Sequence, residues 1–446
     1  MNSFFRHTIY LLLPFLPLSA FAQENSEDLS QSRLREDAVV LENPLADEHI
    51  SSYPFLNIKA NRIKLNGDNW ERLREKFAKT DSAAFTIVHI GDSHIQADVL
   101  TGTVRDNLQK KYGNGGRGII IPFKIAGSNE PYSYTFTTDK PVVSAKLLSV
   151  PWLSDMRFTG ASFTPKAMKY SISLNTEVVR NPDGSPFNKI RLYSRGRFFI
   201  DNITDEKGVK LIPSVIPSSG YVDINLPVSV KGIKLSLHSF ENVSFSGASL
   251  TNGNSGIVYH AIGNNGATFS NYNRIENFGK DVASLSPDLI IISLGTNDAF
   301  GKISDESLIE ELNYLLKQLK DARPKVKFLL TTPMECQRTF RSYRKRRKGS
   351  RRRYSYTRSQ TVNTRVATVA DAIRKYAAEN KIPLYDFYEV AGGNGASSRW
   401  VSSKIMSSDR IHLSFPGYRV AGDLFTEALR HSLINRYSES DQSSNE

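Results

Sequence analysis

The chain has 446 residues, of which 39% are hydrophobic and 23% are charged. These values are typical of a globular protein of two or three domains, and they exclude a fibre, a peptide hormone or a small disulfide scaffold. No apolar run reaches the ~18 residues of a membrane-spanning helix, the single cysteine (Cys336) permits no internal disulfide, and the formal net charge is +13.

The N-terminus has the features of a secretory signal peptide. Arg6 precedes the apolar stretch IYLLLPFLPLSAF, which ends in a small-x-small cleavage site and is followed by the polar segment QENSED. We predict a signal peptide over residues 1–22 and a flexible linker over residues 23–50 that is too polar to bury a core. A buried N-terminal helix is the alternative, which the two prolines in the run disfavour. We therefore expect an exported protein with no transmembrane segment after cleavage.

Residues 51–123 and 257–436 alternate strand patterns with helical patterns. Continuous apolar, β-branched runs occur at FTIVHI (85–90), IVYHAIG (257–263), LIIISLG (289–295), VKFLLTTP (326–333) and IPLYDF (382–387). Helical spacing is present at Trp70, Leu73 and Phe77, at Leu100, Val104, Leu108 and Tyr112, at Leu308, Leu312, Leu315, Leu316 and Leu319, at Val362, Val366, Val369 and Ile373, and from Pro416 to Leu424, Phe425 and Leu429. This alternation predicts an α/β domain with a five-stranded parallel sheet that is covered on both faces.

Residues 124–256 interrupt this rhythm. They contain short alternating runs such as KIRLYSRGRFFI and YVDINL, separated by the turn sequences NPDG, SSG and NGNSG, and no good helical pattern. We predict an inserted, separate antiparallel β-sandwich between the first and second strands of the sheet. Residues 437–446 are expected to be a disordered tail.

The positive charge is concentrated in residues 338–358, which hold eleven Lys or Arg and no acid, so that removing these and Arg6 leaves a formal charge of +1. Tyr343, Tyr354 and Tyr356 interleave with the arginines, a composition that would suit nucleic acid, but export disfavours that partner. We expect a mobile basic loop near the active face that attracts anionic wall polymer or lipid head groups. A merely solvated loop is the alternative.

Polar or glycine-rich sequences follow three of the expected strands, where ligands bind in open parallel sheets. GDSH (91–94) places Ser93 at the start of a helix, where backbone N–H groups favour a developing anion, although a plain capping serine would look the same. GNNGATF contains Gly266, and GTND contains Asn297; both could donate a hydrogen bond to one oxyanion, or belong to ordinary turns.

A fourth sequence, DRIHLSFPGY, places Asp409 three residues before His412. This spacing lets the carboxylate accept the imidazole Nδ1–H and leaves Nε2 free to take a proton from Ser93. A helix-capping Asp beside a surface His is the alternative. The order of the four sequences, each on the appropriate side of a strand or helix, favours a serine nucleophile with its base.

GDSH, NNGAT, GTND and DxxH resemble four conserved blocks of the SGNH/GDSL hydrolases, which are esterases on a flavodoxin-like three-layer fold. The resemblance implies that Ser93 is the nucleophile and that Asp409 and His412 complete the triad. It also implies an oxyanion hole formed by the N–H groups of Ser93 and Gly266 and the side chain of Asn297, and a reaction that needs no metal and no cofactor.

Histidine after the nucleophile, the β-rich insert and the export signal resemble the periplasmic peptidoglycan O-acetylesterases. This implies a periplasmic enzyme that acts on an acetylated polysaccharide such as peptidoglycan, with an insert that resembles a carbohydrate-binding module. Two alternatives stay open: a polysaccharide O-acetyltransferase that uses the same acetyl-serine, and a non-catalytic cell-wall glycan-binding protein.

Several further residues are candidates for lesser roles. Trp152, Tyr132 and Trp400 could stack on sugar rings, although packing is the more common role of such residues. His94 is expected to point away from the site and to bond locally, His89 and His260 to be satisfied core histidines, and Cys336 to be non-catalytic.

Overall fold

The computed structural model describes residues 48–149, 154–179, 181–348 and 351–434. The expected signal peptide, the expected tail and residues 23–47 of the expected linker lie outside these ranges. The linker prediction is wrong at its C-terminal end, because residues Glu48–Ser51 form the short helix α2 and Ile50 is buried in the core.

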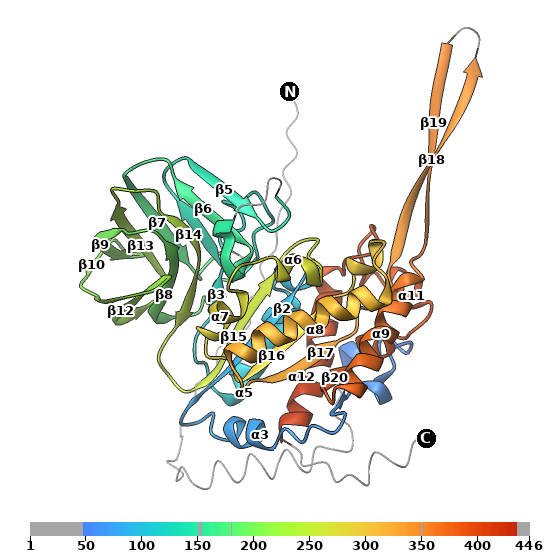
Figure 1. Ribbon diagram of the computed structural model, residues 1–446, viewed down its shortest axis with the longest axis horizontal. Coiled ribbons are helices and arrows are strands. Elements are labelled where there is room, and N and C mark those ends of the chain that lie inside the picture. Colours follow the sequence, from blue (N-terminus) through green and yellow to red (C-terminus); the bar gives the residue numbers. More distant parts are fainter. Residues whose placement is uncertain (1–47, 150–153, 180, 349–350, 435–446) are drawn as a thin grey trace, which may run out of the picture. The chain divides into compact units, whose positions relative to one another are not determined.

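The central sheet contains the five predicted parallel strands and one more. Its order is β1-β20-β17-β16-β2-β15 (Figure 1). The bounds are β1 Ile63–Lys64, β2 Ala84–Gly91, β15 Gly256–Gly263, β16 Leu289–Ser293, β17 Lys327–Thr331 and β20 Leu384–Tyr385. Strand β1 pairs with β20 in the antiparallel direction, and its two residues are too few to give a sequence pattern. Numbered along the chain, the parallel strands lie in the order 2-1-3-4-5, which is the flavodoxin-like arrangement.

Helices cover both faces of this sheet, as the continuous apolar strands require. One face carries α3 (Glu71–Phe77), α5 (Leu100–Tyr112) and α12 (Phe415–Ile434), which share a buried cluster with β2 and β16. The other face carries α7 (Phe278–Ala283), α8 (Asp305–Ala322) and α9 (Arg365–Glu379). The predicted helices are therefore present, except that Val362 ends a strand instead of beginning α9.

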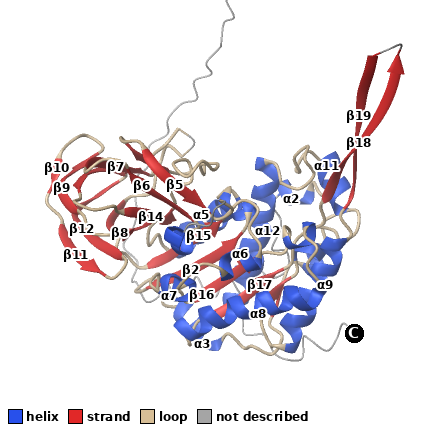
Figure 2. Cartoon of the chain, turned by 45° about the horizontal axis from the view of Figure 1, so that its top comes forward, coloured by secondary structure: helices blue, strands red, loops and turns tan. Residues whose placement is uncertain are grey.

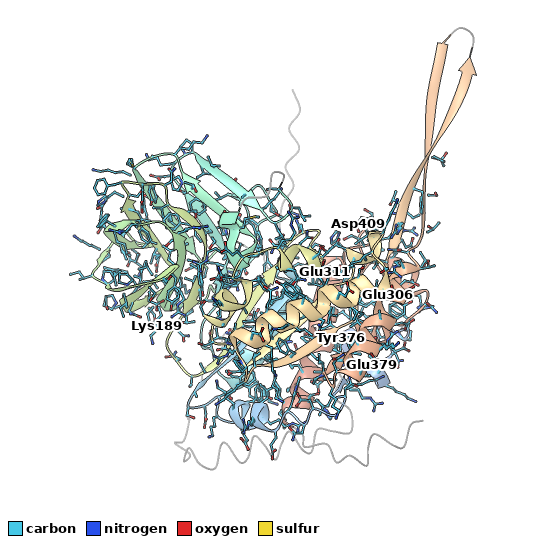
Figure 3. All side chains as sticks on the ribbon, in the orientation of Figure 1. Lys189, Glu306, Glu311, Tyr376, Glu379 and Asp409 are labelled. Carbon is cyan, nitrogen blue, oxygen red and sulfur yellow. The ribbon has the colours of Figure 1, made fainter. Side chains whose placement is uncertain are left out.

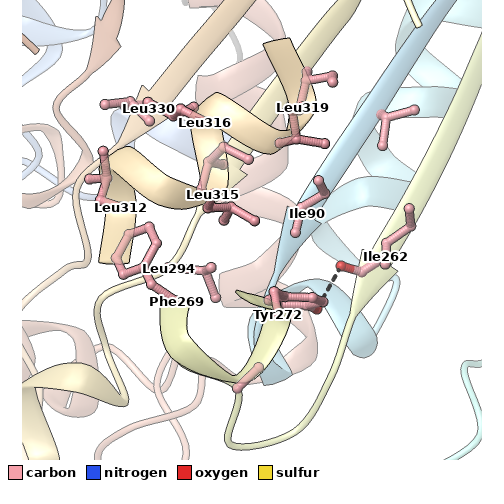
Figure 4. Close-up of a cluster of buried hydrophobic side chains, with 14 of the residues drawn as sticks. Ile90, Ile262, Phe269, Tyr272, Leu294, Leu312, Leu315, Leu316, Leu319 and Leu330 are labelled. Atoms are coloured by element: carbon pink, nitrogen blue, oxygen red, sulfur yellow. Dashed lines mark hydrogen bonds between the residues drawn. The ribbon is translucent and has the colours of Figure 1, made fainter. Parts of the chain in front are cut away.

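Helix α8 shows how sequence produces this layer. Ser304 caps its first turn by accepting a hydrogen bond from the backbone N–H of Ser307. Leucines at positions 308, 312, 315, 316 and 319 lie on one side of the helix and are buried. Figure 4 shows four of them against Ile90 and Leu330 of the sheet.

Between α5 and β15 the chain forms two antiparallel sheets that pack face to face. One has the order β10-β9-β13-β7-β4 and the other the order β11-β12-β8-β14-β6-β5, with β3 paired to β14. The bounds are β3 Gly118–Ile120, β4 Thr135–Thr138, β5 Val142–Lys146, β6 Ala161–Pro165, β7 Lys169–Asn175, β8 Phe187–Arg195, β9 Phe199–Asp205, β10 Lys210–Leu211, β11 Ser214–Ser218, β12 Tyr221–Val230, β13 Gly232–His238 and β14 Ser244–Thr251, with the 3₁₀ turn η3 at Ser154–Thr159. Inward side chains of both sheets form one apolar cluster. Because β3 belongs to these sheets, the expected boundary at residue 124 is too late.

The insert shares buried contacts with the α/β part, which the expectation of a separate sandwich did not include. Phe158 and Tyr193 belong to the same apolar cluster as Val88 and Ile262. Arg117 and Ser133 both donate to a carboxylate oxygen of buried Asp98, at 2.5 Å each. Burial alone would raise the pKa of Asp98, but Arg105 and Arg117 hold it below its usual range. The insert is thus fixed beside the turn that follows β2.

The basic segment is not a loop but part of an antiparallel hairpin, β18 (Gln337–Lys348) with β19 (Arg351–Val362) (Figure 2). Its charged sequence has no alternating apolar face, which is why the strand signal was missed. Short helices complete the fold: η2 Ile58–Ala60, α4 Ser93–Gln96, α6 Phe269–Asn273, η4 Asp298–Phe300, α10 Phe387–Val390 and α11 Ala396–Ser402. In the described part of the chain, no helix is both long and apolar enough to pass through a bilayer.

Candidate active site

The sequences singled out above meet in one pocket at the C-terminal ends of the parallel strands. Its walls come from the turns after β2, β15 and β16, from the loop before α12, and from the start of the insert. The lining residues are Ser93, Gln96, Ala97, Val99, Asn129, Glu130, Tyr132, Asn265, Gly266, Asn297, Phe300, Ile411, His412, Phe415 and Tyr418. From β2 the chain continues to β15 on one side of the sheet, and then to β16 on the other side of β2. The strand order therefore reverses between β2 and β16, and open parallel sheets bind ligands at such a position.

Ser93, His412 and Asp409 form a continuous chain of hydrogen bonds. The Nδ1 atom of His412 lies 2.7 Å from Oδ2 of Asp409, and Nε2 lies 2.8 Å from Oγ of Ser93. A carboxylate only accepts, so Nδ1 carries the proton and the hydroxyl of Ser93 donates to Nε2. This leaves Nε2 able to accept the serine proton, the arrangement of a nucleophile with its general base.

The pKa values of this pair move in the directions that the chemistry needs. The hydrogen bond to Asp409 raises the pKa of His412 above its ordinary value, against the opposing effect of burial. Burial would raise the pKa of Asp409, but the bonds from His412 and from the backbone N–H groups of Ile411 and His412 lower it overall. Asp409 therefore remains a carboxylate, the form that would stabilise an imidazolium at His412.

The loop that holds Asp409 and His412 contains a residue in the left-handed region, Arg410, at φ +60°. Such a conformation is unfavourable for a side chain with a Cβ and persists only when its surroundings enforce it. Gln337 supplies that restraint: its backbone N–H donates to the carbonyl of Arg410, and its side-chain oxygen accepts from Nη1 at 2.8 Å. The first residue of the hairpin thus holds the histidine loop.

Ser93 is the first residue of α4, directly after β2. Asp92 precedes it as the helix cap and accepts a hydrogen bond from the backbone N–H of His94 at 3.0 Å. Close packing of β15 on this turn requires glycine at position 263, where a Cβ would lie 2.1 Å from the backbone nitrogen of Gln96. The nucleophile turn is therefore fixed against the neighbouring strand.

The expected oxyanion donors, Gly266 and Asn297, line the same pocket as Ser93. Gly266 has φ +77°, and an added Cβ would lie 2.6 Å from the side chain of Leu148. The amide nitrogen of Asn297 donates to the carbonyl of Ala267 at 3.0 Å and to Asp92 at 3.3 Å. An oxyanion would have to replace the longer of these two bonds.

Gln96 is a pocket residue that the sequence reasoning missed. Its Oε1 accepts from the backbone N–H of Asn265 at 2.7 Å, and its Nε2 donates to Ser128 and to the carbonyl of Asn129, each at 2.9 Å. It therefore joins the nucleophile helix, the Gly266 turn and the start of the insert. Its position three residues after Ser93, one helical turn along, was the available signal.

Asp298, next to Asn297, is also part of this wall. It is buried, and one carboxylate oxygen accepts from the backbone N–H of Phe269 at 3.4 Å. Burial raises the pKa of Asp298 to about 7. The turns after β15 and β16 are thus tied together directly behind the expected oxyanion donors.

The histidines outside the triad differ in part from expectation. The ring of His94 lies 5.4 Å from the ring of His412 between centroids, and its Nδ1 is 3.1 Å from the hydroxyl of distant Tyr418, so it neither points away nor bonds locally. His89 is a satisfied core histidine, bonded to Tyr259 and Ser293, and burial lowers its pKa to about 3. His260 is buried too, but among the described residues its Nδ1 has no hydrogen-bond partner.

The remaining candidates separate clearly. Trp400 is 0% exposed and donates its indole N–H to the carbonyl of Ala391, so the prediction that it stacks on sugar is wrong. Tyr132 lines the pocket, packed edge-to-face on Phe415, and Trp152 lies outside the described residues. Burial raises the pKa of the Cys336 thiol to about 12, which leaves it protonated at neutral pH. Within the described residues, no group of three or more His, Cys, Asp or Glu side chains is placed to hold a metal.

Comparison with known proteins agrees with this geometry. Residues 243–420 match the GDSL-like Lipase/Acylhydrolase family. The resemblance to SGNH hydrolases is confirmed. A peptidoglycan O-acetylesterase is similar in structure, with a TM-score of 0.64 at 21% identity over 83% of this chain and 97% of that one, so the two folds match over most of this chain.

Two smaller proteins match less of the chain. A lipase/acylhydrolase from Enterococcus faecalis has a TM-score of 0.28 at 18% identity, covering 40% of this chain and 77% of its own. A lipolytic G-D-S-L family member from Veillonella parvula has a TM-score of 0.26 at 14% identity, covering 39% and 79%. Comparison with curated proteins finds no matching sequence.

Proposed function

We propose that the protein is a serine esterase that removes O-acetyl groups from a cell-wall polysaccharide, with peptidoglycan as the substrate. The observation that supports this most is the chain of hydrogen bonds from Asp409 through His412 to Ser93, with distances of 2.7 and 2.8 Å. This arrangement makes a serine hydroxyl nucleophilic at neutral pH without a metal ligand set.

In the proposed reaction His412 removes the proton of Ser93 as the hydroxyl attacks the acetyl carbonyl. The negative charge that develops on the carbonyl oxygen is stabilised by the N–H groups of Ser93 and Gly266 and by the amide of Asn297. His412 then gives its proton to the sugar oxygen, which leaves as an alcohol. Water repeats the sequence on the acetyl-serine and releases acetate.

The proposed substrate rests on two observations. A structural relative that matches 83% of this chain is a peptidoglycan O-acetylesterase. Asn129, Glu130 and Tyr132, at the start of the insert, also line the pocket. Their polar groups and aromatic ring are suited to contact with a sugar. Such a substrate, together with the expected signal peptide, favours a periplasmic location.

The test is to measure acetate released from O-acetylated peptidoglycan and from acetylated xylan, for the wild type and for Ser93→Ala. We expect faster release from peptidoglycan, abolished by the substitution. Faster release from xylan would reject the substrate and keep the esterase. Equal acetate from both proteins would reject the esterase, and transfer of acetyl to an added glycan acceptor in place of acetate release would identify a transferase.

A further inference from the structure

The β18–β19 hairpin has a charge pattern that β-pairing alone does not explain. Its register places four cationic pairs directly opposite one another: 341 with 358, 346 with 353, 347 with 352, and 348 with 351. Residues directly opposite in an antiparallel ladder have Cβ atoms about 4.5–5.5 Å apart, and like charges at that distance oppose pairing. Such a ribbon gains stability when anionic groups lie along it.

The cationic positions fall on both faces of the ribbon. Residues two apart along a strand share a face, and directly paired residues share it too. Positions 341, 345, 347, 352 and 358 therefore share one face, with the three tyrosine positions 343, 354 and 356. Positions 338, 344, 346, 348, 351 and 353 share the other. A flat membrane would meet only one face, whereas a flexible linear polyanion can contact both.

The root of the hairpin lies at the rim of the pocket. Besides the Gln337–Arg410 bonds, the side chain of Gln360 donates to the carbonyl of Ser408 at 3.1 Å. Arg338 donates to the carbonyl of Ala299, and its guanidinium lies 4.9 Å from the ring centroid of Phe300, a pocket residue. The hairpin thus begins between the loop that holds Asp409, labelled in Figure 3, and the loop that holds Asn297.

We propose that the β18–β19 hairpin binds an acidic polysaccharide and holds that polymer at the mouth of the pocket. Arg side chains bind carboxylates in a bidentate manner, and tyrosine adds an apolar ring with a hydroxyl that can pack on sugar. This inference rests on the proposed function, since the bound polymer is the acetylated glycan or is attached to it. The expected substrate class is therefore an anionic glycan.

The main test is binding to polygalacturonate, with dextran as the neutral polymer, measured on the full chain carrying Ser93→Ala so that turnover plays no part. In the hairpin variant four arginines are replaced by glutamine: Arg346, Arg347, Arg352 and Arg353. In the matched control four exposed lysines elsewhere are replaced by glutamine: Lys207, Lys210, Lys320 and Lys325.

We expect the hairpin variant to bind polygalacturonate at least about tenfold more weakly at low salt, with a difference that shrinks as salt screens the charges. The control variant should bind as the parent does, and dextran should bind to none of the three. Equal binding by the hairpin variant would overturn the proposal. So would tighter binding of the parent to single-stranded DNA or to anionic lipid vesicles than to polygalacturonate, because either would assign the surface to another partner.

A second measurement does not depend on a substituted chain. Trypsin cleaves after Lys and Arg, and the opposed cations should let the free hairpin open and be cut. Polygalacturonate should slow cleavage within residues 341–358 of the wild type, and dextran should not. Equal cleavage rates with both polymers would overturn the proposal. Protection by polygalacturonate without esterase activity would instead reject the proposed function and leave the hairpin as a polymer-binding surface.

Discussion

The two sides of the pocket are built in different ways. On the proton-transfer side, Asp409 holds His412 through bonds that span two or three residues of one loop. On the oxyanion side, Asn297 and Gly266 are held by bonds between segments far apart in the chain, from Asp92 to Asn297 and from Gln96 to Asn265. The bonds between Asp409 and His412 lie within one loop, although Gln337 restrains Arg410 of that loop from a distant segment. The bonds around Asn297 and Gly266 all require the sheet and the insert to be in place.

Removal of the proposed nucleophile, Ser93, should have the largest effect on activity. Ser93→Ala should lower kcat for an aryl acetate by about 10⁴- to 10⁶-fold, because among the described residues no other hydroxyl is bonded to the His412 side chain. The thermal unfolding midpoint should be unchanged, since the side chain is small and lies at the pocket. Retention of more than about a tenth of the activity would remove Ser93 from the reaction.

Asp409→Asn tests the proton-transfer side through its pH dependence. His412 must be neutral to accept the serine proton, so activity falls as the pH drops through its pKa, which Asp409 raises. The variant should lose about 10²- to 10⁴-fold in kcat, and its acid limb should move to lower pH. The pH dependence of kcat gives the loss, and that of kcat/KM gives the acid limb of the free enzyme; an unmoved acid limb would contradict the assignment.

Asn297→Ala tests the oxyanion side. Loss of one donor should reduce kcat by about 10²- to 10³-fold with a smaller effect on KM, because the bond strengthens only as charge develops. Asn265→Ala, another asparagine of the same pocket, is the matched control and should lose far less. Similar losses in the two variants would mean that Asn297 has no special place among these amides.

Substitution of Gln96 should have the smallest effect on kcat of the four changes, and it tests how the Gly266 turn is positioned. Gln96→Leu should lower kcat by about 10- to 10²-fold by releasing the Gly266 turn, without removing a reacting group. Gln96→Glu keeps an oxygen for the N–H of Asn265 but loses the donors to Ser128 and Asn129. It should recover part of the activity. If both variants lose equally, the bond to Asn265 is not what positions the turn.

The sequence predicts the proton-transfer side better than the oxyanion side, because Asp409 and His412 are neighbours in the chain whereas Asn297 and Gly266 are held by distant segments. DRIH contains both the carboxylate and the imidazole, and GDSH follows an unmistakable buried strand. The anchoring of Asn297 on Ala267, and the role of Gln96, depend on three segments that meet only after folding. The sequence left two roles open for Trp400, sugar stacking and packing, because an aromatic residue near the histidine loop looks alike in sequence whether it is buried or exposed.

The five parallel strands could be predicted because they are continuous apolar runs, and their helices because buried apolar residues recur at helical spacing. Strand β1 has only two residues, and the hairpin β18–β19 has almost no apolar residues, so neither gives such a pattern. The sequence also contains no sign of the core that the insert shares with the α/β part. Phe158 lies in the short turn η3 and Tyr193 in strand β8, and neither segment has a pattern that tells contact with another domain from contact within a sandwich.

The placement of the insert has a consequence for how the chain reaches its native state. Strand β2, which ends at the nucleophile, pairs in register with β15, so that Ala84 must find Gly256 across the entire insert. Loop-closure entropy and long sequence separation slow such pairings. While residue 256 has not yet left the ribosome, strand β2 therefore lacks β15 as its neighbour. We expect esterase activity to appear only late in synthesis.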